Sequence, residues 1–326
     1  MNHLTTTLFS GLILGTSIIG FGCDGLSAQS PTDGAAASKP PRVFAVNFPL
    51  QSFAQTIGGS KVAVESPSLD GGSSINFDPT PEQIITIQDA KLIILNGADF
   101  ASWTANASLP SSRTVVTAEE FRSQWLESTH DHHHHDHDHQ HGPDGDGVHH
   151  HAHWASYTWL DPNHARDQAV AIGTAMRGTL RAAELQGMST RLDALLKELG
   201  ALCDQAAKIR TLKLPPVIAS EPVYQYLAAG CSLDMHEADW HWNEPQPHGG
   251  MDGLRNLIEA TGARHLLVPE APTSERLEVL RGLGLVPVVV MPLADPPSAK
   301  NTKSFAELMK GNLDRLEALA VTQPAG

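Results

Sequence analysis

Short apolar segments alternate with helical ones along most of this chain, and this alternation constrains the fold more than any other feature. The first strand-like segments, beginning at Val43, are VFAVNFPL, KVAVESPS, KLIILNG and RTVVTAEEF. Between them lie the helix-like segments SFAQTIGG and PEQIITIQDA. Short strands that alternate with helices are typical of βαβ units and a mainly parallel sheet. The N-terminal part therefore reads as an α/β lobe.

The same alternation returns after Pro215 and Pro216. Its segments are PVIAS, VYQYLAAG, LRNLIEATGA, HLLVPE, SERLEVLRGLG and LVPVVVMPL, followed by the helical SFAELMKGNLDRLEALA. The chain has 326 residues, about twice the usual size of a single domain. We therefore predict an α/β fold with two lobes, each built on a mainly parallel sheet.

A long helix is predicted between the two lobes. A first helical stretch begins at Asn163, and apolar residues then recur at three- and four-residue spacing from Met188 to Ile209. That spacing places them on one face of a helix of about 22 residues, or about 33 Å. We expect the N-terminal lobe at 42–161, the linking helices at 162–210 and the C-terminal lobe at 211–326.

The N-terminus has the features of an export signal. An uncharged apolar run extends from Leu8 to Phe21, which is too short to cross a bilayer comfortably. Residues 1–28 are expected to be a signal peptide, with a lipid attached at Cys23 or with ordinary cleavage after Ala28. Residues 29–41 are rich in Ser, Ala and Pro and are expected to be a tether. Either route places the mature protein in the periplasm or on the outer face of a bacterial membrane.

Charge and cysteine content exclude several classes of function. The chain has 22 basic and 36 acidic side chains, a net charge of −14, and its Lys and Arg residues are scattered. Phosphate binding needs a concentrated basic surface, so a nucleic-acid partner is not expected. Past Cys23 the cysteines are Cys203 and Cys231. They could pair in an oxidising compartment or remain two separate buried thiols, and neither lies in a Cys-x-x-Cys arrangement.

A histidine-rich tract separates the first lobe from the linking helices. Of the 18 histidines in the chain, 12 lie in this tract: His130, His132, His133, His134, His135, His137, His139, His141, His149, His150, His151 and His153. The tract lacks apolar periodicity, so it is predicted to be an exposed loop. Neutral imidazoles bind Zn²⁺, Cu²⁺ and Ni²⁺ well, so the loop is expected to collect such ions. The alternative is a solvated insertion without a role.

Several motifs in this order resemble the metal-specific substrate-binding proteins of bacterial ABC importers, of the zinc-binding ZnuA type in cluster A-I. They are NFDPTPEQI, AKLIILNGADFASW, TWLDP, EPVYQYLAAGCSL and HLLVPEAPTSERLEVL, and a His/Asp-rich loop ahead of WLDP is similar to that of the zinc-binding members. The resemblance implies a monomeric, non-enzymatic receptor for Zn²⁺ or Mn²⁺ that works with an ABC permease.

The resemblance also implies a metal site between the lobes, made by three histidines and a carboxylate. Carried over position by position, these four ligands fall on Ile75, Tyr157, Glu221 and Met291. Ile75 cannot bind a metal, and the Tyr157 phenol has an ordinary pKa near 10, which makes it a poor ligand at neutral pH. Glu221 is the position that can still coordinate.

Nearby residues are candidates for a rebuilt site. The segment MHEADWHWNEP, read as a loop, contains His236, Glu237, Asp239, His241 and Glu244, and His248 follows it. Loops after parallel strands bind ligands in open α/β sheets, so we name Glu221, His241, His236, Glu244 and Glu270 as metal-ligand candidates. Two alternatives remain: a periplasmic metal buffer or chaperone with a vestigial cleft, and a metallohydrolase that uses Glu270 or Glu237 as a base.

Overall fold

The structure is a computed structural model that describes residues 39–67, 72–128, 153–298, 300 and 302–320. It contains two parallel four-stranded sheets, which confirms the predicted two-lobe α/β class. The first sheet has the order β2-β1-β3-β4, with β1 at Arg42–Ala45, β2 at Ala63–Glu65, β3 at Leu92–Leu95 and β4 at Thr114–Val116. The second repeats this order as β6-β5-β7-β8, with β5 at Val217–Ala219, β6 at Met235–Glu237, β7 at His265–Val268 and β8 at Val286–Val289.

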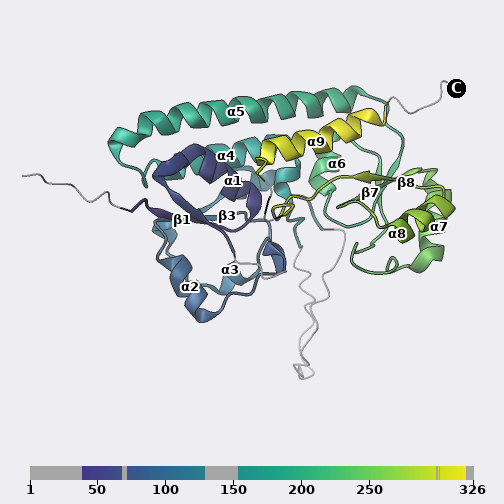
Figure 1. Ribbon diagram of the computed structural model, residues 1–326, viewed down its shortest axis with the longest axis horizontal. Coiled ribbons are helices and arrows are strands. Elements are labelled where there is room, and N and C mark those ends of the chain that lie inside the picture. Colours follow the sequence, from purple (N-terminus) through teal and green to yellow (C-terminus); the bar gives the residue numbers. More distant parts are fainter. Residues whose placement is uncertain (1–38, 68–71, 129–152, 299, 301, 321–326) are drawn as a thin grey trace, which may run out of the picture. The chain divides into compact units, whose positions relative to one another are not determined.

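Helices follow the strands and pack around the sheets (Figure 1). Their bounds are α1 Phe48–Gly58, α2 Pro81–Gln88, α3 Trp103–Asn106, α4 Pro162–Met176, α5 Ala182–Thr211, α6 Gln225–Cys231, α7 Gly250–Thr261, α8 Ser274–Gly282 and α9 Phe305–Ala318. Side chains cap several of their N-termini: Asn47 accepts a hydrogen bond from the Leu50 N–H, and Asp161 accepts one from the Asn163 N–H. These caps satisfy backbone donors that a helix leaves unpaired in its first turn.

Helix α5 is longer than its apolar stripe predicts. It has 30 residues rather than about 22, because it begins six residues before Met188 and ends two residues after Ile209. The reason is a polar start: Glu184 accepts hydrogen bonds from the backbone and the guanidinium of Arg181. The apolar face, from Met188 to Ile209, is buried as expected. The helix packs against α1 and α4 of the first lobe and against α6 and α9 further along the chain (Figure 1).

The segment between β8 and α9 crosses to the first lobe. The backbone N–H of Phe48 donates to the Ala294 carbonyl at 2.9 Å, and the indole N–H of the fully buried Trp159 donates to the Pro292 carbonyl at 2.8 Å. Because these bonds join residues far apart in sequence, they fix residues 292–294 against the N-terminal lobe. Residues 292–294 also line a pocket together with residues of the N-terminal lobe.

Strand β6 differs from the sequence prediction. Met235–Glu237 had been read as part of a loop, but it pairs with β5 in parallel, with Ile218 opposite His236. All three of its residues are half-buried, and the strand lies at the edge of the sheet. An edge strand of this kind needs no continuous apolar run, so its sequence, MHE, carries little strand signal.

Two further expectations concern cysteines and membranes. Cys203 on α5 and Cys231 at the end of α6 are free thiols, and burial raises their pKa to about 11 and about 12.

In the described part of the chain, each helix is too short or too polar to span a membrane. The expected signal peptide, Cys23 and most of the expected tether lie outside the described residues.

Shortening Leu199 tests the packing of α5. Leu199 is fully buried, so Leu199→Ala is expected to lower the free energy of unfolding by about 2–5 kcal/mol through lost burial and the remaining cavity. Val170→Ala on α4 is the control, because Val170 is 40% exposed and its truncation should change stability by no more than about 0.5 kcal/mol. Urea denaturation measures both, and equal effects would contradict the role given to the buried face.

Candidate functional site

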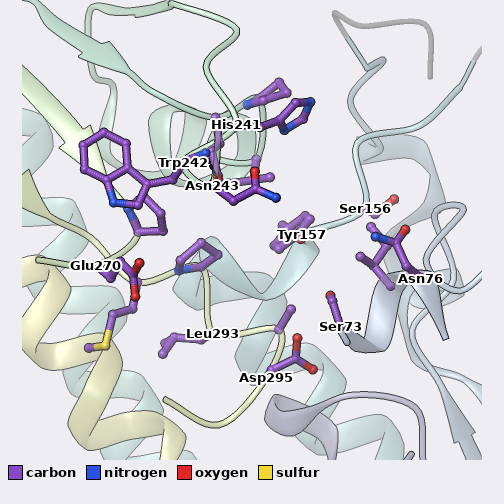
Figure 2. A pocket seen from close by; sticks show the side chains of 18 of the residues that line it. Ser73, Asn76, Ser156, Tyr157, His241, Trp242, Asn243, Glu270, Leu293 and Asp295 are labelled. Atoms are coloured by element: carbon purple, nitrogen blue, oxygen red, sulfur yellow. Dashed lines mark hydrogen bonds between the residues drawn. The ribbon is translucent and has the colours of Figure 1, made fainter. Parts of the chain in front are cut away.

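A pocket of about 820 Å³ lies between residues of the two lobes (Figure 2). Its C-terminal-lobe residues follow the strands in order: Glu221 comes after β5, His241 after β6, Glu270 after β7 and Met291 after β8. The carboxyl ends of parallel strands meet at one edge of a sheet, which explains how residues far apart in sequence converge. Ser73, Ile75 and Tyr157 line the pocket from the other lobe.

All four positions implied by the family resemblance line this pocket. They are Ile75, Tyr157, Glu221 and Met291. Met291 is held by Asn312 of α9, whose amide accepts from the Met291 N–H at 3.0 Å and donates to its carbonyl at 2.8 Å. The structure therefore brings the four positions to one pocket, although Ile75, Tyr157 and Met291 are not good ligands for Zn²⁺.

Tyr157 remains a neutral phenol in this setting. Burial raises its pKa, and the carboxylates of Glu221 and Asp295 raise it further. Its ring packs edge-on against Phe100 and lies tilted against Trp159, with centroids at 6.3 Å and 5.0 Å. A phenolate would be needed for strong metal coordination, so Tyr157 contributes shape and a hydroxyl rather than a charged ligand.

Glu221, which takes the place of a family histidine in the resemblance, is the one of the four positions whose side chain can coordinate a metal. Burial raises its pKa, a hydrogen bond from the Trp242 N–H to Oε1 at 2.9 Å lowers it, and the charges of His241 and Glu270 act in opposite directions. Glu221 is therefore within electrostatic reach of both His241 and Glu270. These three candidates, predicted separately from the sequence, face one pocket.

Asp295 is a pocket residue that sequence reasoning missed. It accepts hydrogen bonds from the Ser74 N–H at 3.1 and 3.3 Å, and Figure 2 shows its side chain beside Ser73. It lies four residues after Met291 in MPLADPP, and an Asp-Pro pair just after a buried strand was the available signal. Glu221, Glu270 and Asp295 are all acidic, and the described residues that line the pocket include no Lys or Arg. The pocket therefore favours a cation.

A second group of side chains lies in the loop between β6 and α7. One ligand atom from each of Asp239, His241 and His248 lies within 4.8 Å of the others. His248 makes two contacts, from Nδ1 to Asp239 Oδ2 at 3.0 Å and from Nε2 to Glu244 Oε2 at 3.1 Å. Glu244 thus approaches this cluster but does not line the pocket.

His236 is separated from these groups. It lies on β6, where its Nε2 contacts Asp234 Oδ1 at 3.2 Å, and it does not line the pocket. Glu237, the other residue of this strand named as a candidate base, accepts a hydrogen bond from Gln225 at 3.1 Å.

The histidine tract lies outside the described residues except for its last member, His153. His153 is exposed, and its carbonyl accepts a hydrogen bond from the Ser128 N–H at 2.7 Å. Glu127 and Trp154 form an antiparallel bridge next to it. Ser128 and Trp154 both line the pocket, so the two flanks of the tract are joined at the pocket edge.

Comparison with known proteins gives consistent matches. A family model described as zinc-uptake complex component A, periplasmic (ZnuA), matches residues 43–319. A putative metal-binding protein of Treponema pallidum (strain Nichols) is 23% identical over 306 residues, covering 89% of this chain and 90% of that protein. The iron-binding protein YfeA of Yersinia pestis is 33% identical over 78 residues, so the match spans 24% of this chain and 24% of that relative.

Solved structures show the same fold. The metal-dependent lipoprotein YcdH of Bacillus subtilis has a TM-score of 0.69 at 17% identity, covering 85% of this chain and 98% of that one. The Zn(II)-bound ZnuA-like domain of AdcA from Streptococcus pneumoniae has a TM-score of 0.68 at 15% identity, covering 86% and 99%. At these identities the likeness concerns the architecture.

Tyrosine ionisation tests the buried character of the site. The chain has three tyrosines, Tyr157, Tyr224 and Tyr226, and burial raises the pKa of each. At a pH of about 10 the folded protein is expected to contain little tyrosinate, whereas tyrosines of the unfolded chain should be about half ionised. The stability from the neutral phenols is complete below the unfolded pKa and is lost as the pH rises toward the folded values.

Ultraviolet absorbance of tyrosinate against pH, with and without guanidinium, measures this difference. The Tyr157→Phe variant shows which part of the absorbance change belongs to the tyrosine in the pocket. A folded-state titration near pH 10 that disappears in Tyr157→Phe would contradict the burial of this hydroxyl.

Proposed function

The chain belongs to the ZnuA family of periplasmic zinc-uptake components, and from that premise we propose that it captures a transition metal for an ABC importer. The proposed cargo is Zn²⁺, with Mn²⁺, Cu²⁺ and Ni²⁺ as alternatives. The proposed partner is an ABC permease, and the proposed location is the periplasm or the outer face of the membrane, with the lipid anchor at Cys23 as one route. The family consists of substrate-binding proteins rather than enzymes.

One observation carries this proposal. The four positions that the family resemblance assigns to the metal site line a single pocket, in which Glu221 can coordinate and His241 and Glu270 lie within its electrostatic reach. A carboxylate and an imidazole are suitable ligands for Zn²⁺ and Mn²⁺. The Zn(II)-bound AdcA domain and the iron-binding YfeA support a metal as the cargo.

The proposed mechanism has three steps. The tract from His130 to His153 collects metal at the pocket edge, the pocket binds it through Glu221 and His241, and the loaded protein delivers it to the permease. Helix α5 packs against helices of both lobes, so a large hinge opening would break its buried face. We therefore propose that capture and delivery need only modest lobe movement.

A metal buffer or chaperone is the second candidate. The observation that favours it is that Ile75, Tyr157 and Met291, three of the four positions assigned by the resemblance, are poor ligands for Zn²⁺. In that case the tract alone would bind metal, and the pocket would be vestigial. A metallohydrolase based on Glu270 or Glu237 is a third hypothesis, which would require turnover with bound zinc.

Zinc calorimetry on two forms of the mature protein separates these candidates. One form is intact, and the other carries a short Gly/Ser linker in place of residues 129–152, which the Ser128–His153 hydrogen bond allows to close without strain. Binding at the pocket should survive this replacement, and Glu221→Gln should weaken it by about tenfold or more, because a charged ligand becomes neutral. The matched control is Glu259→Gln, an exposed carboxylate on α7.

The outcomes are distinct. Loss of all zinc binding on replacement of the tract would identify a buffer. Retained binding that is insensitive to Glu221→Gln would remove Glu221 from the site. Hydrolytic turnover by the zinc-loaded protein would favour the enzyme hypothesis instead.

A further inference from the structure

We infer that the loop between β6 and α7 forms a second cation site, in which Asp239, His241 and His248 bind a divalent transition metal at the rim of the pocket. One ligand atom from each lies within 4.8 Å of the others. Two imidazoles and a carboxylate are a ligand set suited to Zn²⁺. All three come from the C-terminal lobe, so this site goes beyond the pocket site of the proposed function and does not need the other lobe.

The present spacing is close to that of a zinc site. Neighbouring ligands of a tetrahedral zinc ion lie about 3.3 Å apart, because each is about 2.0–2.2 Å from the metal. Asp239 Oδ2 and His248 Nδ1 are 3.0 Å apart, so a small opening of this contact admits an ion between them. His241 completes the set, and its ring centroid already lies 5.1 Å from that of His248.

Glu244 contacts the ring nitrogen of His248 that does not face Asp239. Its Oε2 lies 3.1 Å from His248 Nε2, while Nδ1 of the same ring faces Asp239. When a ligating imidazole donates its other ring N–H to a carboxylate, the carboxylate fixes the tautomer and the orientation of the ring and makes the ligating nitrogen more basic. Glu244 therefore acts as a positioning residue, and His248 binds through Nδ1.

The loop that carries these ligands is anchored on both sides of His241. Trp240 and Trp242 are buried, with 1% and 5% of their surface exposed, while Asp239 and His241 next to them are half-buried. The Trp240 N–H donates to Ser220, and its indole donates to the Glu244 carbonyl at 3.1 Å. Burial of alternate residues thus presents the ligands on one side of a fixed backbone, which reduces the entropy that metal binding must cost.

Arg276 of α8 contacts the same loop through hydrogen bonds and through its position over two indole rings. Its guanidinium donates to the backbone carbonyls of Trp242 and Glu244 and lies over both indole rings, 5.2 Å from the centroid of Trp240 and 4.4 Å from that of Trp242. The ends of the loop are also joined, because the His248 N–H donates to the Asp239 carbonyl at 3.0 Å. The cluster is therefore supported by contacts that do not involve its ligand atoms.

His241 connects the rim site to the pocket. His241 belongs to the cluster and also lines the pocket (Figure 2). His248 is exposed, so the metal can enter from solvent. Three protein ligands leave a fourth position open, which is typical of sites that exchange a ligand rather than hold a structural ion. The rim cluster therefore receives an ion and passes it to the pocket through the shared imidazole.

Zinc calorimetry and Co²⁺ absorption spectra on His248→Ala and Asp239→Asn test the rim site, in the intact protein and in the form with the linker at 129–152. In the linker form, His248→Ala should remove one equivalent of zinc and the tetrahedral Co²⁺ bands that belong to it. Glu244→Gln should keep the stoichiometry and weaken that equivalent by about 10- to 100-fold. The matched control is His236→Ala, an imidazole of the same lobe that contacts Asp234 instead.

The variants also separate this inference from the proposed function. Unchanged zinc binding and Co²⁺ spectra in a folded His248→Ala protein would overturn the rim site, even if Glu221→Gln still weakened the pocket. Loss of one equivalent in His248→Ala with no effect of Glu221→Gln would support the rim site and contradict the pocket. Circular dichroism verifies folding, and His248→Gln replaces the alanine variant if that variant unfolds. An equal loss in His236→Ala would also overturn the inference.

Discussion

Parallel pairing in one repeated strand order determines where each candidate ligand lies. The carboxyl ends of β5, β6, β7 and β8 meet at one edge of the second sheet, and the residues that follow them enter a common pocket. Residues 292–294 also line this pocket. Hydrogen bonds from Phe48 and Trp159 fix them against the first lobe. The pocket thus depends on backbone topology and on hydrogen bonds that join residues far apart in sequence.

Electrostatics then restricts what this pocket can hold. Glu221, Glu270 and Asp295 contribute negative charge, and the described lining residues provide no Lys or Arg to balance it. Burial, and to a smaller extent the charge of Glu270, raise the pKa of Glu221 more than the Trp242 N–H and His241 lower it, so its charged form is only partly compensated. A bound divalent cation would supply that compensation. The pocket therefore favours positive charge even though Ile75, Tyr157 and Met291 are poor metal ligands.

Much of the fold could be predicted from the sequence because buried parallel strands are apolar, and LIIL of β3 or HLLV of β7 needs no other signal. The strand β6 could not, since an edge strand reading MHE resembles a polar loop. In the site, Glu221 and Glu270 could be placed because they follow apolar strands, whereas His241 was named only as part of a loop, since the strand before it carries little signal. Asp295 was missed because its approach to Ser74 depends on the path of the chain after β8, which tertiary contacts such as that of Asn312 determine.

The tryptophans of the β6–α7 loop show why this segment was difficult to interpret from sequence alone. Trp240 and Trp242 look like aromatic residues at a binding surface, yet both are buried beneath the loop and stack on Arg276. Their burial fixes the backbone on which the half-buried Asp239 and His241 lie, so the apolar residues determine the position of the polar ones. Backbone hydrogen bonds and the stacking of Arg276 hold this loop without using the ligand atoms of Asp239 and His241. A rigid loop with one exposed imidazole suits rapid exchange of an ion at the pocket rim.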